Sequence, residues 1–71
     1  MTDSKRLREW IEAKGYKLKA VAAALNITPA ALAQKIGNKR EFRASEIAAF
    51  VYDLGMTTAE RDKIFFAKVV N

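Results

Sequence analysis

Apolar residues recur along the chain at the three- and four-residue spacing of amphipathic helices. The pattern predicts helices over residues 4–14, 18–25, 29–36, 44–54 and 58–68. Local signals support these ranges, because Gly15 follows the first helix and Thr57 forms a capping box with Glu60 before the last. No segment alternates convincingly in the manner of a β-strand. The sequence therefore predicts an all-α, five-helix bundle that forms a single domain over residues 1–71.

The second and third predicted helices are short and are separated by a tight turn. Asn26 tolerates the left-handed conformation that such a turn needs, and Thr28 with Pro29 is a strong start signal for the next helix. Ala22 provides a small side chain where the two helices must approach closely. This spacing over residues 18–36 is typical of a helix-turn-helix, whose second helix enters the DNA major groove. A helical hairpin with no role in nucleic-acid binding has the same local pattern.

The positive charge of the chain is concentrated in its middle. The net charge is +5, and residues 14–43 alone carry +6, with seven cations against the single anion Glu41. This asymmetry favours a polyanionic partner such as DNA. A solvated basic face is the alternative interpretation.

Composition excludes several function classes. The chain has no histidine and no cysteine, which argues against common metal sites and against His- or Cys-based catalytic triads. Its carboxylates are scattered among basic residues, so we expect no enzymatic activity, no metal, no cofactor and no small-molecule ligand. No apolar run approaches the roughly 18 residues of a membrane span, and no signal-peptide pattern is present. We therefore expect a cytoplasmic protein with no membrane contact.

Blocks of residues over nearly the whole chain carry a resemblance to a known family. They are Gly15-Tyr16, Val21-Ala22, Leu25, Ile27-Thr28, Leu32, Lys35-Ile36, Asn38-Lys39-Arg40-Glu41-Phe42, Glu46-Ile47, Leu54-Gly55, Thr57, Glu60-Arg61-Asp62 and Ile64-Phe65-Phe66. Together they resemble the phage Cro/repressor family of helix-turn-helix transcription regulators. The resemblance implies a lambda-repressor-like DNA-binding fold. It also implies a sequence-specific, usually dimeric regulator of phage or prophage type that binds an operator.

The third predicted helix turns Leu32 and Ile36 inward, and its outward residues match the base-facing positions of the family's recognition helix. The residues predicted to read bases are Pro29, Ala30, Ala33, Gln34 and Asn38. Gln34 suits the edge of adenine, and the alanines suit thymine methyl groups. This helix offers few hydrogen bonds, so we expect DNA shape to add to its specificity.

Phosphate contacts are predicted at both ends of this helix and around it. The predicted residues are Lys17, Lys19, Thr28, Ala31, Lys35, Lys39, Arg40 and Arg43. Amides at a helix N-terminus bind phosphate, and cations in flanking loops meet the DNA backbone. Two positions depart from the family. Leu18 stands where glutamine is common in the family, which weakens the expected phosphate contact at the start of the second helix. Arg43 replaces a Thr cap, so the fourth helix loses that cap and gains a cation.

Ile64, Phe65 and Phe66 are consecutive, and one face of a helix cannot bury all three. These residues therefore predict a subunit contact. The predicted contact residues are Ile64, Phe65, Phe66 and Val69. A symmetric homodimer would present two recognition helices about 34 Å apart. The alternative is that these residues are core, followed by a frayed tail.

The Ala-rich third helix also supports a second hypothesis about function. A surface with few polar groups suits close packing against another protein. Some small phage proteins that resemble this family are antirepressors, which bind a repressor's DNA-binding domain and block its operator surface. A phage repressor protein is therefore the alternative partner to operator DNA.

Overall fold

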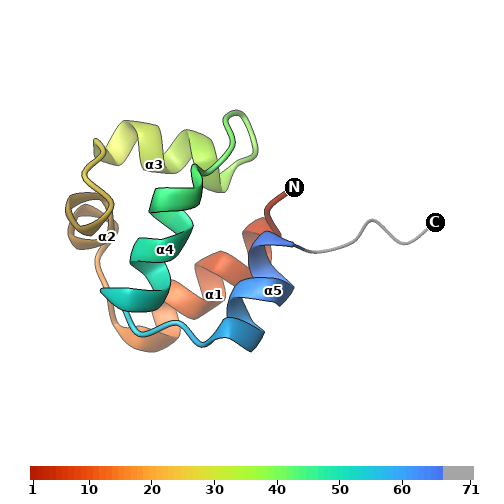
Figure 1. Cartoon of the computed structure of the whole chain (residues 1–71). Helices are drawn as coiled ribbons and strands as arrows, with labels where there is room; N and C mark the ends of the chain where they lie inside the picture. Colours follow the sequence, from red (N-terminus) through yellow and green to blue (C-terminus); the bar gives the residue numbers. More distant parts are fainter. Residues whose placement is uncertain (67–71) are drawn as a thin grey trace.

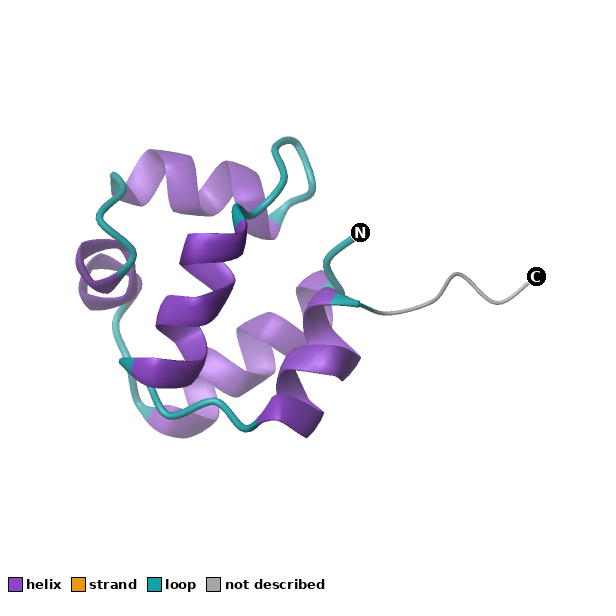
Figure 2. Cartoon of the chain, in the orientation of Figure 1, coloured by secondary structure: helices purple, strands orange, loops and turns teal. Residues whose placement is uncertain are grey.

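The computed structural model describes residues 1–66, and these residues form five α-helices and no strand (Figure 1, Figure 2). The helices are α1 Ser4–Lys14, α2 Leu18–Ala24, α3 Pro29–Ile36, α4 Ala44–Tyr52 and α5 Thr58–Phe65. The predicted all-α, five-helix bundle is thereby confirmed. Within the described part of the chain, no helix is long and apolar enough to cross a membrane.

Three helices end earlier than the apolar pattern predicts. α2 ends one residue before Leu25, which serves as its C-cap. α4 ends at Tyr52 because Asp53 caps it, and Gly55, with a φ of 82°, then turns the chain toward α5. α5 ends at Phe65 with Phe66 as its C-cap, and residues 67 and 68 of the predicted helix lie outside the described part of the chain.

Left-handed residues end several elements, and two of them were predicted from residue type. Gly15 has a φ of 74° after α1, and Asn26 has a φ of 59° in the turn after α2. At the end of α3 the left-handed residue is Asn38, with a φ of 62°, whereas Gly37 has a φ of −80°. Asparagine tolerates this conformation better than most residues. The turn after α3 therefore depends on Asn38 and not on glycine.

One hydrophobic core connects all five helices. Its buried members are Leu7, Trp10, Ile11, Val21, Ala22, Leu25, Leu32, Ile36, Phe50, Leu54, Met56, Ile64 and Phe65. Phe50 is fully buried, and its ring lies 5.9 Å from that of Trp10 and 5.2 Å from that of Phe65, measured between centroids. Met56 belongs to the core although its position after α4 carries no helical pattern, and Ile47 is only partly buried.

The arrangement of the helices leaves one side of α3 in solvent. α3 packs on α2 and on α1, while α5 packs on α4 and α1 (Figure 1). Ala22 is buried where α2 meets the turn, and its carbonyl accepts a hydrogen bond from the Ile27 N–H at 3.0 Å. The burial of this small side chain agrees with the predicted close approach of α2 and α3, which contact each other directly. The other side of α3, together with the loop over residues 37–43, forms an exposed edge of the molecule.

Candidate nucleic-acid interface

The start of α3 is shaped by its own cap. The Thr28 hydroxyl accepts a hydrogen bond from the Ala31 N–H at 3.1 Å, and Pro29 occupies the first turn without an N–H to satisfy. The prediction that Ala31 donates its amide to a phosphate needs correction, because that amide already donates to Thr28. The Thr28 side chain itself is exposed.

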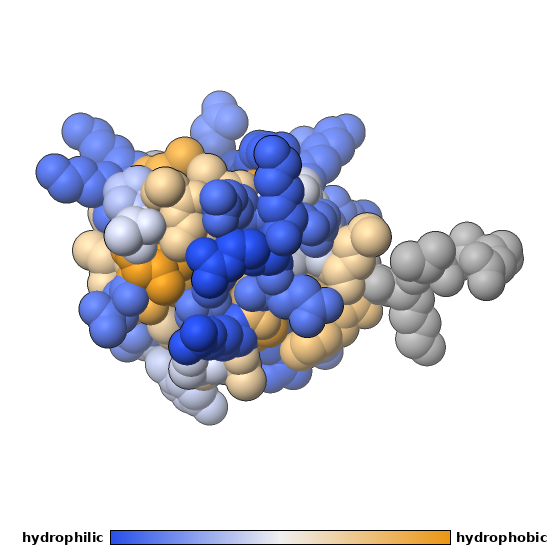
Figure 3. Space-filling view, turned by 90° about the horizontal axis from the view of Figure 1, so that it is seen from above, coloured by the Kyte–Doolittle hydropathy of each residue, from blue (hydrophilic) through white to orange (hydrophobic). Residues whose placement is uncertain are grey.

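The outward side of α3 is formed by the residues that the inward pattern predicted. Leu32 and Ile36 are buried in the core. The exposed residues on the opposite side are Pro29, Ala30, Ala33, Gln34 and Gly37. Gln34 alone among them carries a polar side chain. Figure 3 looks onto α3 and its following loop from above, and hydrophilic side chains cover much of this face between hydrophobic patches.

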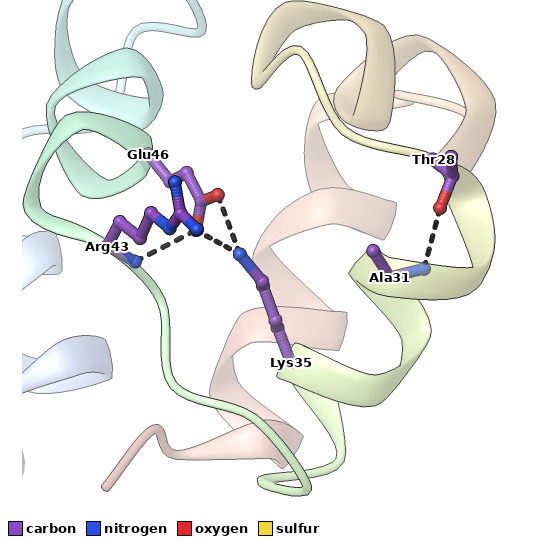
Figure 4. A network of polar contacts seen from close by, with 5 residues as sticks. All are labelled: Thr28, Ala31, Lys35, Arg43 and Glu46. Carbon is purple, nitrogen blue, oxygen red and sulfur yellow. Dashed lines mark hydrogen bonds and ion pairs between the residues drawn. The ribbon is translucent and has the colours of Figure 1, made fainter.

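Lys35 does not belong to this exposed surface, which corrects its predicted role in phosphate binding. Only 3% of the residue is exposed, and its ammonium nitrogen lies 2.6 Å from each carboxylate oxygen of Glu46 (Figure 4). The helical period places position 35 on the side of α3 that faces α4. A buried ammonium needs an anionic partner, and Glu46 supplies it.

Glu46 also accepts a hydrogen bond from the backbone N–H of Arg43 at 2.8 Å. Burial raises the pKa of Glu46. Hydrogen bonds from Lys35 and from the Arg43 amide, together with the charges of both residues, outweigh burial and hold this pKa below its ordinary value of 4.5. α4 thus keeps part of its N-terminal cap through Glu46, although the arginine side chain has no acceptor to offer at the N-cap position. The predicted loss of the cap is therefore correct for the side chain at position 43, but the hydrogen bond between the Arg43 N–H and Glu46 remains.

Asn38 is bound to the N-terminal segment of the chain instead of facing a base edge. Its side-chain Nδ2 donates to the Thr2 carbonyl at 2.8 Å and to the Ser4 hydroxyl at 3.1 Å, and its Oδ1 accepts from the Thr2 N–H at 2.9 Å. Both N–H groups of the amide and its oxygen are therefore occupied. The prediction that Asn38 reads a base needs correction, because its side-chain amide is already bound to Thr2 and Ser4. No sequence pattern indicates that residue 2 lies beside residue 38.

Three cations remain exposed on the loop and at the start of α4. They are Lys39, Arg40 and Arg43. The Lys39 N–H donates to the Gln34 carbonyl at 2.9 Å, which joins the loop to the last turn of α3. Phe42 anchors the middle of the loop, because its ring contacts Phe50 and Phe65 at centroid distances of 5.8 and 5.1 Å. The loop is thus fixed at several points while its cations project into solvent.

The start of α2 contributes two further exposed cations, Lys17 and Lys19. Between them lies Leu18, half exposed at 50%. Leu18 borders a mainly apolar hollow beside α3. The sequence did not predict this hollow, and its only signal is an exposed leucine between two lysines. The hollow is lined by Arg8, Ile11, Glu12, Tyr16, Leu18, Ala33 and Ile36.

A second surface, on α4 and α5, exposes large apolar side chains. Ile64 and Phe65 are buried in the core, so their predicted roles in a subunit contact need correction. Phe66 is 57% exposed, and Tyr52, which is not among the predicted contact residues, is 85% exposed. Val69 lies outside the described residues. The surface is grooved, and its lining residues are Phe42, Ala44, Ile47, Ala48, Val51, Tyr52, Thr58, Arg61 and Phe66.

Comparisons with known proteins do not assign this chain to a family. No protein family matches it, and neither does any curated protein or solved structure. Residues 1–66 do not bring three His, Cys, Asp or Glu side chains together in an arrangement that could hold a metal ion.

Proposed function

We propose that this protein is a sequence-specific, DNA-binding transcription regulator of phage or prophage type, with α3 as its recognition helix. α2, the turn at residues 25–28 and α3 then act as a helix-turn-helix. The observation that carries the proposal is the exposed side of α3 beside the exposed cations of the following loop. A helix that presents small side chains approaches base edges closely, and flanking cations neutralise phosphates.

Recognition of bases in this proposal depends on a few residues of α3. Gln34 has the donor and acceptor that suit N7 and N6 of adenine in the major groove. Ala30 and Ala33 offer methyl groups for contact with thymine methyls, and Pro29 lies at the first turn of the helix. Because these contacts are sparse, sequence-dependent DNA shape supplies part of the specificity.

Affinity for DNA in this proposal comes from exposed cations. Lys39, Arg40 and Arg43 contact phosphates on one side of α3, and Lys17 with Lys19 contacts a flanking phosphate. Phosphate contacts set the register of a protein on the duplex but carry little sequence information. In this mechanism, cations around α3 bind phosphates, and α3 discriminates between base pairs mainly through Gln34.

A homodimer fits the exposed apolar side chains on α4 and α5. Phe66 and Tyr52 border the same groove, and an exposed apolar patch of this kind is typical of a protein–protein contact. A dimer that binds two half-sites of an operator presents its two recognition helices to successive major grooves, about 34 Å apart. A palindromic operator is the expected DNA partner.

Selection of duplexes from a random pool, followed by fluorescence anisotropy across a salt series, tests the proposal. We expect a recurrent palindrome and an association constant that falls steeply with salt, with a log–log slope of about −0.9 for each phosphate neutralised. Lack of an enriched sequence, or affinity that does not change with salt, would contradict the proposed function.

One observation favours an antirepressor as the second candidate function. The hollow beside α3 is mainly apolar, and Leu18 at its edge is half exposed, which suits packing against a protein surface. In this case the chain binds the DNA-binding domain of a phage repressor. Mixing the two at micromolar concentration would yield a co-eluting complex that has lost operator affinity, and Leu18→Gln would weaken it. Separate elution of the two proteins would rule this function out.

A further inference from the structure

Lys35 and Glu46 join the two elements that present the proposed DNA contacts. Lys35 lies in the last turn of α3, and Glu46 lies in the first turn of α4. Their side chains are 3% and 6% exposed, and both carboxylate oxygens lie 2.6 Å from the ammonium nitrogen (Figure 4). This pair is the most buried ion pair of the described residues, since the pairs Arg6–Asp3 and Arg61–Asp62 are largely exposed.

The same carboxylate holds the end of the cationic loop. Glu46 accepts the Arg43 N–H, so one side chain binds both the proposed recognition helix and the N-cap residue of α4. Figure 4 shows Lys35 and Arg43 reaching Glu46 from different elements. At its other end the loop is held by Asn38, whose amide binds Thr2 and Ser4. Arg40 and Arg43 also line the same groove as Lys35 and Glu46.

A buried ion pair is a poor source of stability, because desolvation of two charges offsets most of their attraction. Apolar side chains of similar size often serve a core equally well. An ion pair differs from apolar packing in its direction, since the hydrogen bonds fix which groups meet. The charges at this place therefore add a fixed direction of contact that apolar packing does not supply.

We propose that Lys35 and Glu46 are positioning residues for DNA binding, which hold α3 and Arg43 in one fixed relation. This inference rests on the proposed function. A cation that is held in place before binding loses less conformational entropy on contact with a phosphate. Lys35 thus acts on DNA through Glu46 and Arg43, and it does not touch the duplex.

Two double variants separate this role from simple stability. Lys35→Met/Glu46→Leu replaces the pair by apolar side chains and removes the acceptor of the Arg43 N–H. Lys35→Met/Glu46→Gln also removes both charges but keeps an amide oxygen that accepts this N–H. Lys5→Met/Glu9→Gln is the matched control, because it removes one cation and one anion from exposed positions of α1.

Thermal melts first identify a temperature at which each variant is fully folded, and DNA binding is then measured there across a salt series. We expect the Met/Leu variant to bind the selected duplex about tenfold more weakly, with a salt slope smaller by about 0.9, the contribution of one phosphate contact. The Met/Gln variant loses about threefold in affinity but keeps more of the slope than the Met/Leu variant, by the same counterion argument. The Lys5/Glu9 control binds like the unmodified protein.

Two outcomes separate the failure of this inference from the failure of the proposed function. If the unmodified protein shows no salt-dependent DNA binding, the proposed function fails and the inference fails with it. If the unmodified protein binds DNA and the folded Met/Leu variant matches its affinity and slope, the positioning role alone is overturned. Should the Met/Leu variant not fold, the Met/Gln variant decides, and unchanged affinity there overturns the role as well.

Discussion

Two exposed surfaces of this small bundle differ in the chemistry that they present to water. The edge formed by α3 and residues 37–43 exposes small side chains, Gln34 and several cations. The groove on α4 and α5 exposes Tyr52 and Phe66. Water solvates the first surface well, so a partner must displace this water through opposite charge. Removing the apolar second surface from water lowers the free energy and so favours association. Under the proposed function, the first surface takes a polyanion as its partner and the second surface takes a protein.

The largest expected effect comes from removing charge at the first surface. The triple variant Lys39→Ala/Arg40→Ala/Arg43→Ala should weaken binding to any duplex about a hundredfold at low salt, because three phosphate contacts are lost. The salt slope should fall by about 2.7, which is three contributions of about 0.9. Anisotropy titrations at several salt concentrations measure both quantities.

The matched control for this variant is Lys5→Ala/Arg6→Ala/Lys63→Ala, which changes the net charge equally at exposed positions on α1 and α5. We expect it to retain nearly all of the DNA affinity. Equal losses in the two triple variants would show that net charge, and not the edge beside α3, governs binding.

A smaller effect is expected at the second surface. Phe66→Ser should raise the Kd of the homodimer at least about tenfold, since a buried aromatic side chain at an interface commonly contributes more than 1–2 kcal/mol. The melting temperature of the monomer should change little because Phe66 is more than half exposed. Sedimentation equilibrium measures the association, and Phe66→Leu serves as the apolar control. A dimer unaffected by serine would place the subunit contact elsewhere.

Within the first surface, we expect substitution of Gln34 to change sequence discrimination and substitution of Lys39 to change overall DNA affinity. Gln34→Ala should reduce discrimination at one base pair about tenfold, within the roughly 1–3 kcal/mol of a bidentate base contact. Lys39→Ala should weaken specific and random duplexes by the same factor, because it contacts only phosphate. Competition titrations against single-base variants of the selected site distinguish the two, and the opposite pattern would reverse these assignments.

The smallest expected effect concerns pH and the pair beneath this surface. The pKa of Glu46 lies below its ordinary 4.5 in the fold, so this carboxylate stabilises the protein above that pH and less as pH falls through the lowered pKa. The melting temperature should therefore drop less between about pH 5 and pH 3 in Lys35→Met/Glu46→Gln than in the unmodified protein. Glu60, whose pKa is lowered chiefly by the Thr57 N–H, titrates equally in both and serves as an internal reference. Identical pH profiles would contradict this reading of Glu46.

Local signals in the sequence predicted the elements of this fold well. Capping and left-handed residues act within about four positions of one another, which is why Gly15, Asn26 and Thr57 marked their turns and caps correctly. The inward side of α3 was equally predictable, because helical periodicity alone places Leu32 and Ile36 on it. The outward residues of the candidate site followed from the same argument.

The sequence by itself thus determined five helices, their approximate limits and the exposed side of α3, since each depends on neighbours along the chain. Only the tertiary structure decided which polar residues are free to contact a partner. Lys35 meets Glu46 eleven positions away, and Asn38 meets Thr2 across 36 positions. Both pairings depend on how α3 lies against α4 and on where the N-terminal segment passes. Charge and hydrogen-bond partners at such separations have no local pattern, so two predicted DNA contacts proved to be contacts within the fold.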